Sequence, residues 1–285
     1  MVRIPTTPTA PDPLRELRHL TPRDRLVLSW LAEHYVLSTE QIAAAAFPSV
    51  RAAQIRLAVL YRIGAVSRFS FARTEATTGS YRYTLGPLGA LLHPDAYTDP
   101  DHPGAKPPKT HLERRARITR SPRLPHLLGV NQFFIDLIRH TRTHPDAALL
   151  RWWSEQHATA AFETALSRIR PDAHGVWQAA GHQVGLFLEY DRDTEDVARV
   201  IGKLRQYEKL AADGGPRYPV LFWVPDRRRE ASLLRALTSV RLPIPVATAI
   251  HSPHPAGPVW ALPGDPGPRL CLHDLPSEPA PERRR

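Results

Sequence analysis

Hydrophobic positions near the start of the chain recur with the period of amphipathic helices. Apolar residues are spaced three and four apart over residues 21–35, 38–48 and 49–64, so we expect three helices, of which the second is short. Alternation of apolar and polar residues follows over residues 65–70 and 80–85, which predicts two strands joined by a polar turn. Three helices followed by a hairpin are typical of a winged helix-turn-helix, whose third helix enters the major groove of DNA.

Farther along the chain, predicted helices and strands alternate. The helices are expected at residues 126–140, 194–210 and 228–238, and the strands at 149–156, 167–172, 183–191, 218–224 and 244–250. Such alternation predicts a mixed or largely parallel sheet with helices packed on its faces. The expected fold class is therefore α+β or α/β, with an N-terminal winged helix-turn-helix followed by a mixed-sheet α/β domain.

Shifts in composition divide the chain into five parts. Proline and polar residues mark both ends and a central segment that also contains an arginine-rich run. We therefore expect a disordered N-terminus over residues 1–18, the winged domain over 19–92, a linker over 93–123, the α/β domain over 124–252 and a weakly ordered tail over 253–285.

The charge of the chain favours a polyanionic partner. It has 38 Lys and Arg against 28 Asp and Glu, which gives a formal net charge of +10. Guanidinium groups suit phosphates and guanine edges, because their donors form a planar fork. The alternative is that the winged module packs against a protein and its arginines are a solvated face. The candidate DNA contacts are Arg51, Gln54 and Arg62 on the third helix and Arg68, Arg73 and Arg82 on the hairpin.

Cysteine usage and hydropathy exclude several classes of protein. Cys271 is the one cysteine, which excludes a disulfide framework and any thiolate-based zinc site. No apolar run approaches the roughly 18–20 residues of a membrane helix, and the first residues lack the apolar core of a signal peptide. We expect a protein of the reducing cytoplasm that does not enter a membrane. The histidines have no partners at ligand spacing, so no histidine metal site is predicted.

Acidic residues follow two hydrophobic strands of the α/β domain. Asp172 ends the run Arg170-Pro171-Asp172, and Glu189 and Asp191 end the next strand, where their spacing of two puts them on one face. Consecutive strands usually lie side by side, so the three carboxylates are expected to converge. Carboxylate oxygens suit Mg²⁺, which can position a phosphate and activate water. Glu155 also ends a strand and could be a fourth acid of the site, although an acid at such a position is more often a surface residue.

The pattern Pro171-Asp172 followed by Glu189-x-Asp191 resembles the PD-(D/E)xK nucleases. The resemblance implies a nuclease-like fold and gives Asp172, Glu189 and Asp191 catalytic and metal-binding roles. Asp191 stands where that pattern has a lysine, which puts cleavage in doubt. Lys203 from the following helix could replace the lysine, and Tyr207 shares its helix face at i+4, which repeats a Gln-x-x-x-Tyr element of some of these nucleases. Tyr207 is accordingly a candidate DNA contact.

The whole arrangement more closely resembles the actinobacterial replication-relaxation family. The shared elements are a winged-helix front, the Pro171-Asp172 strand, the strand Leu188-Glu189-Tyr190-Asp191 and a helix with Lys203, Leu204 and Tyr207. The resemblance implies a protein of plasmids or other mobile elements.

Three functions remain open from the sequence. The first is a DNA-binding accessory protein of a mobile element, whose nuclease-like domain is a non-cleaving clamp or a platform for a homodimer. The second is a Mg²⁺-dependent DNA endonuclease or nickase that uses Asp172, Glu189 and Asp191. The third is a transcriptional regulator with an unrelated α/β partner domain.

Overall fold

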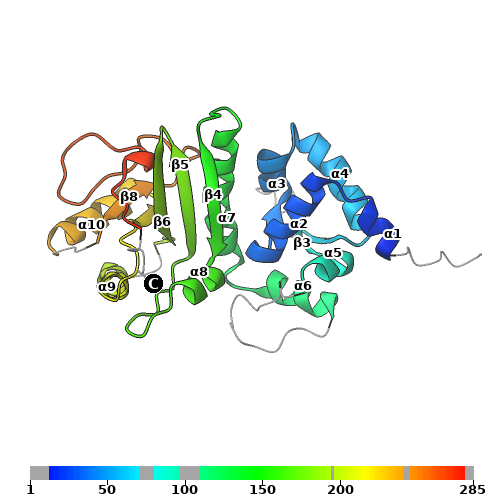
Figure 1. The fold of residues 1–285 in the computed structure, drawn as a ribbon, viewed down its shortest axis with the longest axis horizontal. Helices are drawn as coiled ribbons and strands as arrows, with labels where there is room; N and C mark the ends of the chain where they lie inside the picture. Colours follow the sequence, from blue (N-terminus) through cyan, green and yellow to red (C-terminus); the bar gives the residue numbers. More distant parts are fainter. Residues whose placement is uncertain are drawn as a thin grey trace, which may run out of the picture. The chain divides into compact units, whose positions relative to one another are not determined.

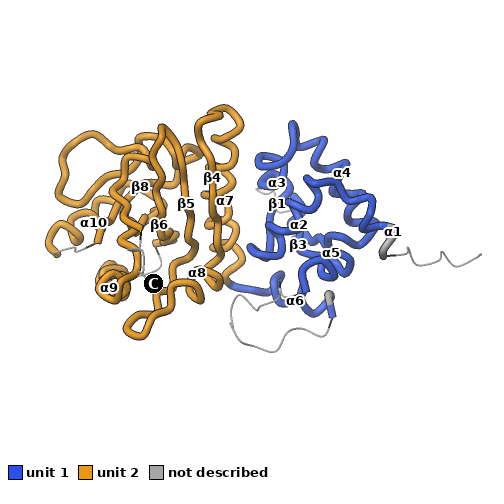
Figure 2. The backbone as a smooth tube through the Cα atoms, viewed as in Figure 1, with its two compact units in different colours: residues 1–122 blue, residues 123–285 orange. Residues whose placement is uncertain are grey.

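The computed structural model describes residues 13–70, 80–94, 96, 110–193, 196–240 and 244–279. These residues form a mixed α+β structure with ten α-helices and eight strands in two sheets (Figure 1). The chain divides into two compact units, residues 1–122 and 123–285 (Figure 2). Within the described ranges, no single helix has the length and apolar composition needed to cross a membrane.

Unit 1 contains three main helices and a small sheet. Its helices are α1 (Pro13–Arg18), α2 (Pro22–His34), α3 (Thr39–Ala46), α4 (Val50–Arg62), α5 (Pro87–Leu92) and α6 (His111–Arg120), and its strands are β1 (Leu37–Ser38), β2 (Val66–Phe69) and β3 (Arg82–Leu85). The sheet is antiparallel in the order β1-β3-β2.

Local sequence explains where these helices begin. Thr21 and Asp24 form a capping box at α2, in which each side chain accepts a hydrogen bond from the other residue's backbone N–H. Ser38 and Gln41 form a second capping box at α3. The Ser49 hydroxyl accepts a hydrogen bond at the start of α4. The three predicted helices are therefore present, with ends that differ by a few residues.

Two predictions about the flanks of unit 1 need correction. Residues 1–18 were expected to be disordered, but Pro13–Arg18 forms α1, and residues 1–12 lie outside the described part. The segment 93–123 was expected to be a linker whose arginine-rich run could follow a phosphate backbone or form a solvated helix, and residues 111–120 form the helix α6. Thr110 caps this helix, and its arginines are paired in part with Glu113, which explains why an arginine-rich run still forms a helix.

Unit 2 is a five-stranded sheet covered on both faces. Its elements in chain order are α7 (Leu124–Thr141), β4 (Ala148–Ser154), α8 (Glu155–Ala161), β5 (Ala173–Ala179), β6 (His182–Tyr190), α9 (Val197–Ala212), β7 (Val220–Val224), α10 (Arg227–Thr238), β8 (Val246–Ile250) and the 3₁₀ helix η1 (Leu272–Asp274). The sheet order is β4-β5-β6-β7-β8. Strands β4, β5 and β6 pair antiparallel, and β6, β7 and β8 pair parallel, so the sheet is mixed as expected.

Two apolar cores hold the helices of unit 2 to this sheet. Helix α7 packs on one face through an aromatic-rich core, in which Phe133 contacts Trp223 and Trp260 and Phe134 stacks on Trp152. Helices α9 and α10 cover the other face through a second core. Figure 1 shows α7 and the α9–α10 pair on opposite sides of the strands. Burial on both faces explains the continuous apolar runs of β6 and β7.

Two predictions for unit 2 are wrong. A strand was expected at 167–172, but the strand is β5 at 173–179, because Pro171 lacks the N–H that a ladder needs. The tail from residue 253 was expected to be weakly ordered, but Trp260 and Leu272 are fully buried in the core under α7. In the same segment, the Arg269 guanidinium donates two hydrogen bonds to the buried Glu230 carboxylate, at 2.8 and 2.7 Å.

Candidate carboxylate site and candidate nucleic-acid interface

Asp172 and Glu189 lie on neighbouring strands of unit 2. The Asp172 backbone N–H donates to the Leu188 carbonyl at 2.9 Å, and Ala173 pairs with Leu188. Asp172 therefore stands beside Glu189 where β5 begins and β6 approaches its end. The sequence predicted this neighbourhood of the two acids from their places in the chain.

Helix α9 supplies the partners of the Glu189 carboxylate. The Tyr207 hydroxyl donates to Oε1 at 2.6 Å, and the Lys203 ammonium contacts Oε2 at 3.1 Å. Lys203 and Tyr207 are one turn apart on the same helix face, so both reach one carboxyl group. The glutamate side chain is 5% exposed and the lysine side chain 37% exposed, which leaves the ammonium as the accessible member of the cluster.

The electrostatics around Glu189 favour its protonated form. Burial raises the pKa of Glu189 to about 7, and the negative charge of Asp172 adds to the increase, while Lys203 and Tyr207 oppose it. Burial and the nearby Glu189 carboxylate in turn raise the pKa of Tyr207 well above its ordinary value. Tyr207 therefore stays a hydrogen-bond donor. Its burial does not fit the predicted role as a DNA contact.

His126 is a member of this site that sequence reasoning missed. Its Nε2 lies 2.9 Å from Asp172 Oδ1, and Asp172 Oδ2 accepts a hydrogen bond from the Tyr190 N–H at 2.7 Å. The Tyr190 ring packs edge-on against His126 and stacks on His251. His126 lies in the first turn of α7, far from Asp172 in sequence, and no motif spacing joins the two.

Asp191 does not join the other two acids. Its Oδ2 accepts from Arg229 Nε at 2.7 Å, and both side chains are nearly buried. Arg229 lies in the first turn of α10 and also contacts Asp193 at 3.4 Å. A cation in the first turn of a helix is unfavourable without an acidic partner, so the run Arg227-Arg228-Arg229 was a signal for this pairing.

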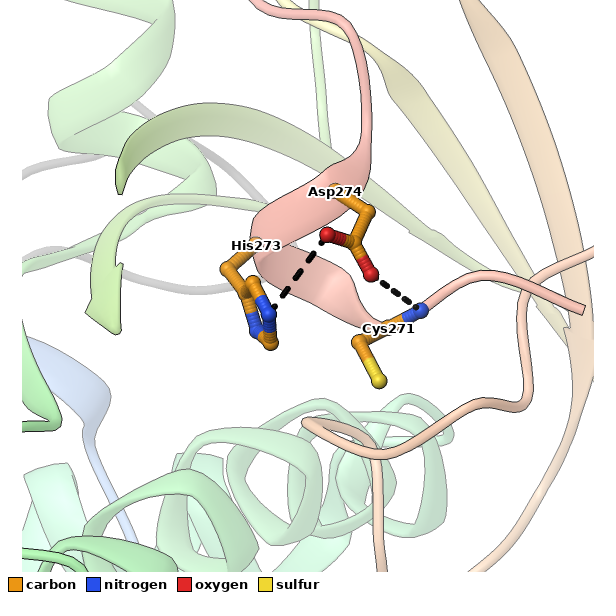
Figure 3. Close-up of side chains that lie close together, drawn as sticks. All are labelled: Cys271, His273 and Asp274. Atoms are coloured by element: carbon orange, nitrogen blue, oxygen red, sulfur yellow. Dashed lines mark hydrogen bonds and ion pairs between the residues drawn. The ribbon is translucent and has the colours of Figure 1, made fainter. Parts of the chain in front are cut away.

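The expected set of three metal ligands is therefore not assembled. Among the described residues, the one group of three or more His, Cys, Asp or Glu side chains whose ligand atoms all lie within 4.8 Å is Cys271, His273 and Asp274 (Figure 3). Asp172 and Glu189 remain as two neighbouring hard oxygen donors. Mg²⁺ commonly takes one or two carboxylates, but here each of the four oxygens already has a partner: His126 and the Tyr190 N–H at Asp172, and Tyr207 and Lys203 at Glu189.

Glu155 contributes to the same region from the start of α8. Its carboxylate pairs with Arg123, and its charge is one of those that raise the pKa of Tyr207. Its side chain is 25% exposed, so it is half-buried rather than a free surface acid. Ser154 caps α8, so Glu155 lies in the first turn of this helix, close enough to Tyr207 for its charge to act there.

The candidate DNA contacts of unit 1 differ in accessibility. Arg51, Gln54 and Arg62 are exposed on α4. The Arg68 guanidinium lies between the Tyr61 and Tyr81 rings, at 4.3 and 4.1 Å from their centres. Arg82 is half-buried and donates to the Ser80 carbonyl, and Arg73 lies outside the described residues.

A sequence model of the replication-relaxation family matches residues 28–220, which is more than half of the chain. The chain belongs to the replication-relaxation family. The match covers the α2–α4 helices and the Asp172, Glu189, Lys203 and Tyr207 cluster, and membership indicates a replication-related function. The comparisons with curated proteins and with solved structures gave no match.

Proposed function

We propose that this replication-relaxation protein binds DNA through unit 1 and that it functions in a plasmid or another mobile element. In this proposal, unit 1 is a winged helix-turn-helix, and unit 2 is a nuclease-like domain that engages DNA without cleaving it. The observation that carries the proposal is the exposed polar face of α4.

Helix α4 has the division of faces that a recognition helix needs. Ala53, Leu57 and Leu60 are fully buried against unit 1. The opposite face exposes Arg51, Gln54 and Arg62, together with Ile55, which is 57% exposed. Arginine and glutamine read base edges by paired hydrogen bonds, and an exposed apolar side chain suits a thymine methyl.

The hairpin β2–β3 supports the same surface. The Arg68 guanidinium contacts the Tyr61 and Tyr81 rings, which restricts its orientation. Donors at the edge of a stacked guanidinium stay available to phosphate oxygens. Arg68 is thus expected to hold a backbone phosphate, while α4 contacts the bases.

The geometry of unit 2 favours a binding role over cleavage. The order α7, three antiparallel strands, α9 and β7 resembles the core of PD-(D/E)xK nucleases. However, Asp191 is neutralised by Arg229, and Glu189 holds its proton up to about neutral pH. Two of the three acids of the expected site are therefore poorly suited to hold a divalent ion at neutral pH, while Lys203 offers a positive charge to a phosphate.

The DNA-binding proposal can be tested by fluorescence anisotropy with duplexes that the wild-type chain selects from a random pool. Arg51→Ala and Gln54→Ala should each weaken binding to the selected duplex by roughly 5- to 150-fold and binding to random DNA by less. Arg235→Ala removes one exposed charge from α10 and is the matched control. Equal losses on both duplexes would remove the base-reading role of α4. Undetectable wild-type binding at low salt would contradict the proposal.

A second candidate function is Mg²⁺-dependent DNA cleavage, favoured by the meeting of Asp172, Glu189 and Lys203. A bound ion would polarise the phosphate and supply activated water. Asp172 and Glu189 would hold the ion, His126 would orient Asp172, and Lys203 would stabilise charge on the phosphate. Nicking of supercoiled plasmid by wild type, lost in Asp172→Asn with Glu189→Gln while anisotropy is unchanged, would establish the nuclease. No cleavage of supercoiled, linear or single-stranded DNA supports the non-cleaving platform.

A further inference from the structure

The segment that follows β8 brings sulfur, nitrogen and oxygen donors together at η1. Cys271 precedes this 3₁₀ turn, and His273 and Asp274 lie within it. Their ligand atoms all lie within 4.8 Å of one another. Figure 3 shows the His273 and Asp274 side chains turned toward each other, with Cys271 beside them. Cys271 and His273 are half-buried and Asp274 is exposed, so the group is reachable from solvent.

The separations suit a tetrahedral ion. His273 Nε2 lies 3.5 Å from Asp274 Oδ1. Bonds of about 2.0–2.2 Å from one zinc ion to nitrogen and oxygen place two tetrahedral ligands roughly 3.3–3.4 Å apart. The pair therefore already has nearly the spacing of two ligands, and the Cys271 sulfur lies within reach of both.

His182 offers a fourth ligand from a different part of the chain. It is the first residue of β6 and is exposed. Its ring centre lies 6.3 Å from that of His273, with the rings at 80°. Two imidazoles on one tetrahedral zinc have centres roughly 5 Å apart, given Zn–N bonds of about 2.0–2.1 Å. His182 lies outside the group whose ligand atoms are within 4.8 Å of one another, so its ring would have to move toward His273 to bind the same ion.

The β5–β6 turn holds His182 in place. Ala180 and Gly181 both have positive φ, 51° and 78°, between the paired residues Ala179 and His182. This is a tight two-residue hairpin turn, which fixes the first residue of β6. The 3₁₀ helix η1 packs against β5 and β6, so the four side chains lie in one neighbourhood.

The chemical types of the four side chains indicate which kind of metal ion would bind. Thiolate and imidazole are soft or borderline ligands that favour Zn²⁺ over Mg²⁺ or Ca²⁺. We propose that Cys271, His273, Asp274 and His182 bind one zinc ion, which fastens the C-terminal segment to the β5–β6 hairpin. From the sequence, the single cysteine was taken to exclude such a site, because the histidine and aspartate that lie near Cys271 in the fold were not considered as its co-ligands.

Cobalt(II) is the probe that reports on this coordination. The full chain, stripped of metal by chelation, is titrated with Co²⁺ and then with Zn²⁺. We expect about one equivalent of Co²⁺ to bind, with a near-ultraviolet thiolate-to-cobalt band and the visible absorption of tetrahedral cobalt, both removed by Zn²⁺.

Variants separate this site from other metal sites. Cys271→Ser should abolish the thiolate band, and His182→Ala should weaken Zn²⁺ binding at least about tenfold, a loss seen even when only a ligand-orienting residue is removed. His19→Ala, an exposed histidine of unit 1, and Asp172→Asn with Glu189→Gln should leave the titration unchanged. A wild-type chain without a thiolate band, or unchanged Zn²⁺ affinity in both Cys271→Ser and His182→Ala, would overturn the proposal.

Discussion

Glu189 is a buried carboxyl group whose charge depends on its burial and on three neighbours, Asp172, Lys203 and Tyr207. Because burial and Asp172 raise its pKa from 4.5 to about 7, the folded chain keeps a proton that the unfolded chain releases. The stabilisation is complete below pH 4.5 and is lost as pH rises through 7. We predict that the free energy of unfolding of unit 2 falls by up to about 3 kcal/mol from pH 4.5 to 8 through this group.

The change in the free energy of unfolding with pH can be measured by urea unfolding followed by tryptophan fluorescence, since five of the six tryptophans lie in unit 2. Glu189→Gln should flatten the pH dependence, because glutamine carries no titrating proton. Asp172→Asn should reduce the pH dependence of the free energy of unfolding, because the charge that helps to raise the pKa of Glu189 is gone. Identical slopes in wild type and Glu189→Gln would contradict this account of the site.

At this scale, the sequence predicted some partners and missed others. Lys203 was expected to reach back toward the acids from the following helix, and it contacts Glu189. Tyr207 was expected to share its helix face and to contact DNA, whereas its hydroxyl donates to Glu189. The contact of His126 with Asp172 could not be predicted, because it depends on how α7 lies across the sheet. Asp191 was placed with the other acids from strand periodicity alone, which contains no information about Arg229 on α10.

The pairing of Asp191 with Arg229 joins β6 to α10 and gives an element-scale prediction. Arg229→Met should lower the free energy of unfolding of unit 2 by about 3–5 kcal/mol, because Asp191 is left buried without its cation. Arg228→Met is the matched control in the preceding position. Its side chain is 83% exposed and pairs with Asp193 at 3.0 Å, so the loss should stay below about 1 kcal/mol.

Chemical denaturation of both variants at pH 7 checks the difference. Equal losses in Arg228→Met and Arg229→Met would mean that the buried ion pair does not hold α10 to the sheet.

The β5–β6 turn gives a second element-scale prediction. Ala180 has φ of 51°, a left-handed conformation that disfavours alanine and suits asparagine or glycine. Ala180→Asn should therefore stabilise unit 2 by roughly 0.5–1 kcal/mol, or a few degrees in Tm. Ala160→Asn, at an exposed position in α8, should instead be neutral or destabilising, since asparagine is a poorer helix former. A lower Tm for Ala180→Asn would contradict the turn geometry.

Most elements of the fold could be predicted because each has local signals. The capped helices α2, α3 and α4 and the apolar runs of β6 and β7 follow from such signals. Strand β5 was missed because its register is set by pairing with β4 and β6 rather than by its own pattern. The sequence did not predict that the C-terminal segment has a defined structure, because a proline-rich composition does not reveal that Trp260 fills the core under α7.

At the scale of the whole molecule, the chain is strongly basic and belongs to a family with a replication-related function. The formal charge of +10 favours DNA, and the family match extends from α2 to the start of β7. Because the exposed face of α4 carries the proposal of DNA binding, contact should be concentrated on unit 1 even if Lys203 adds a phosphate contact on unit 2.

Amide hydrogen exchange of the full chain, with and without the selected duplex, tests DNA binding through α4 most directly and needs no variant. We predict slower exchange in α4 and in β2–β3 when DNA is bound, and unchanged exchange in α10, which has no part in the proposed interface. Protection confined to unit 2, or α4 exchanging at the same rate in a saturated complex, would contradict the assignment of α4 as the helix that contacts DNA.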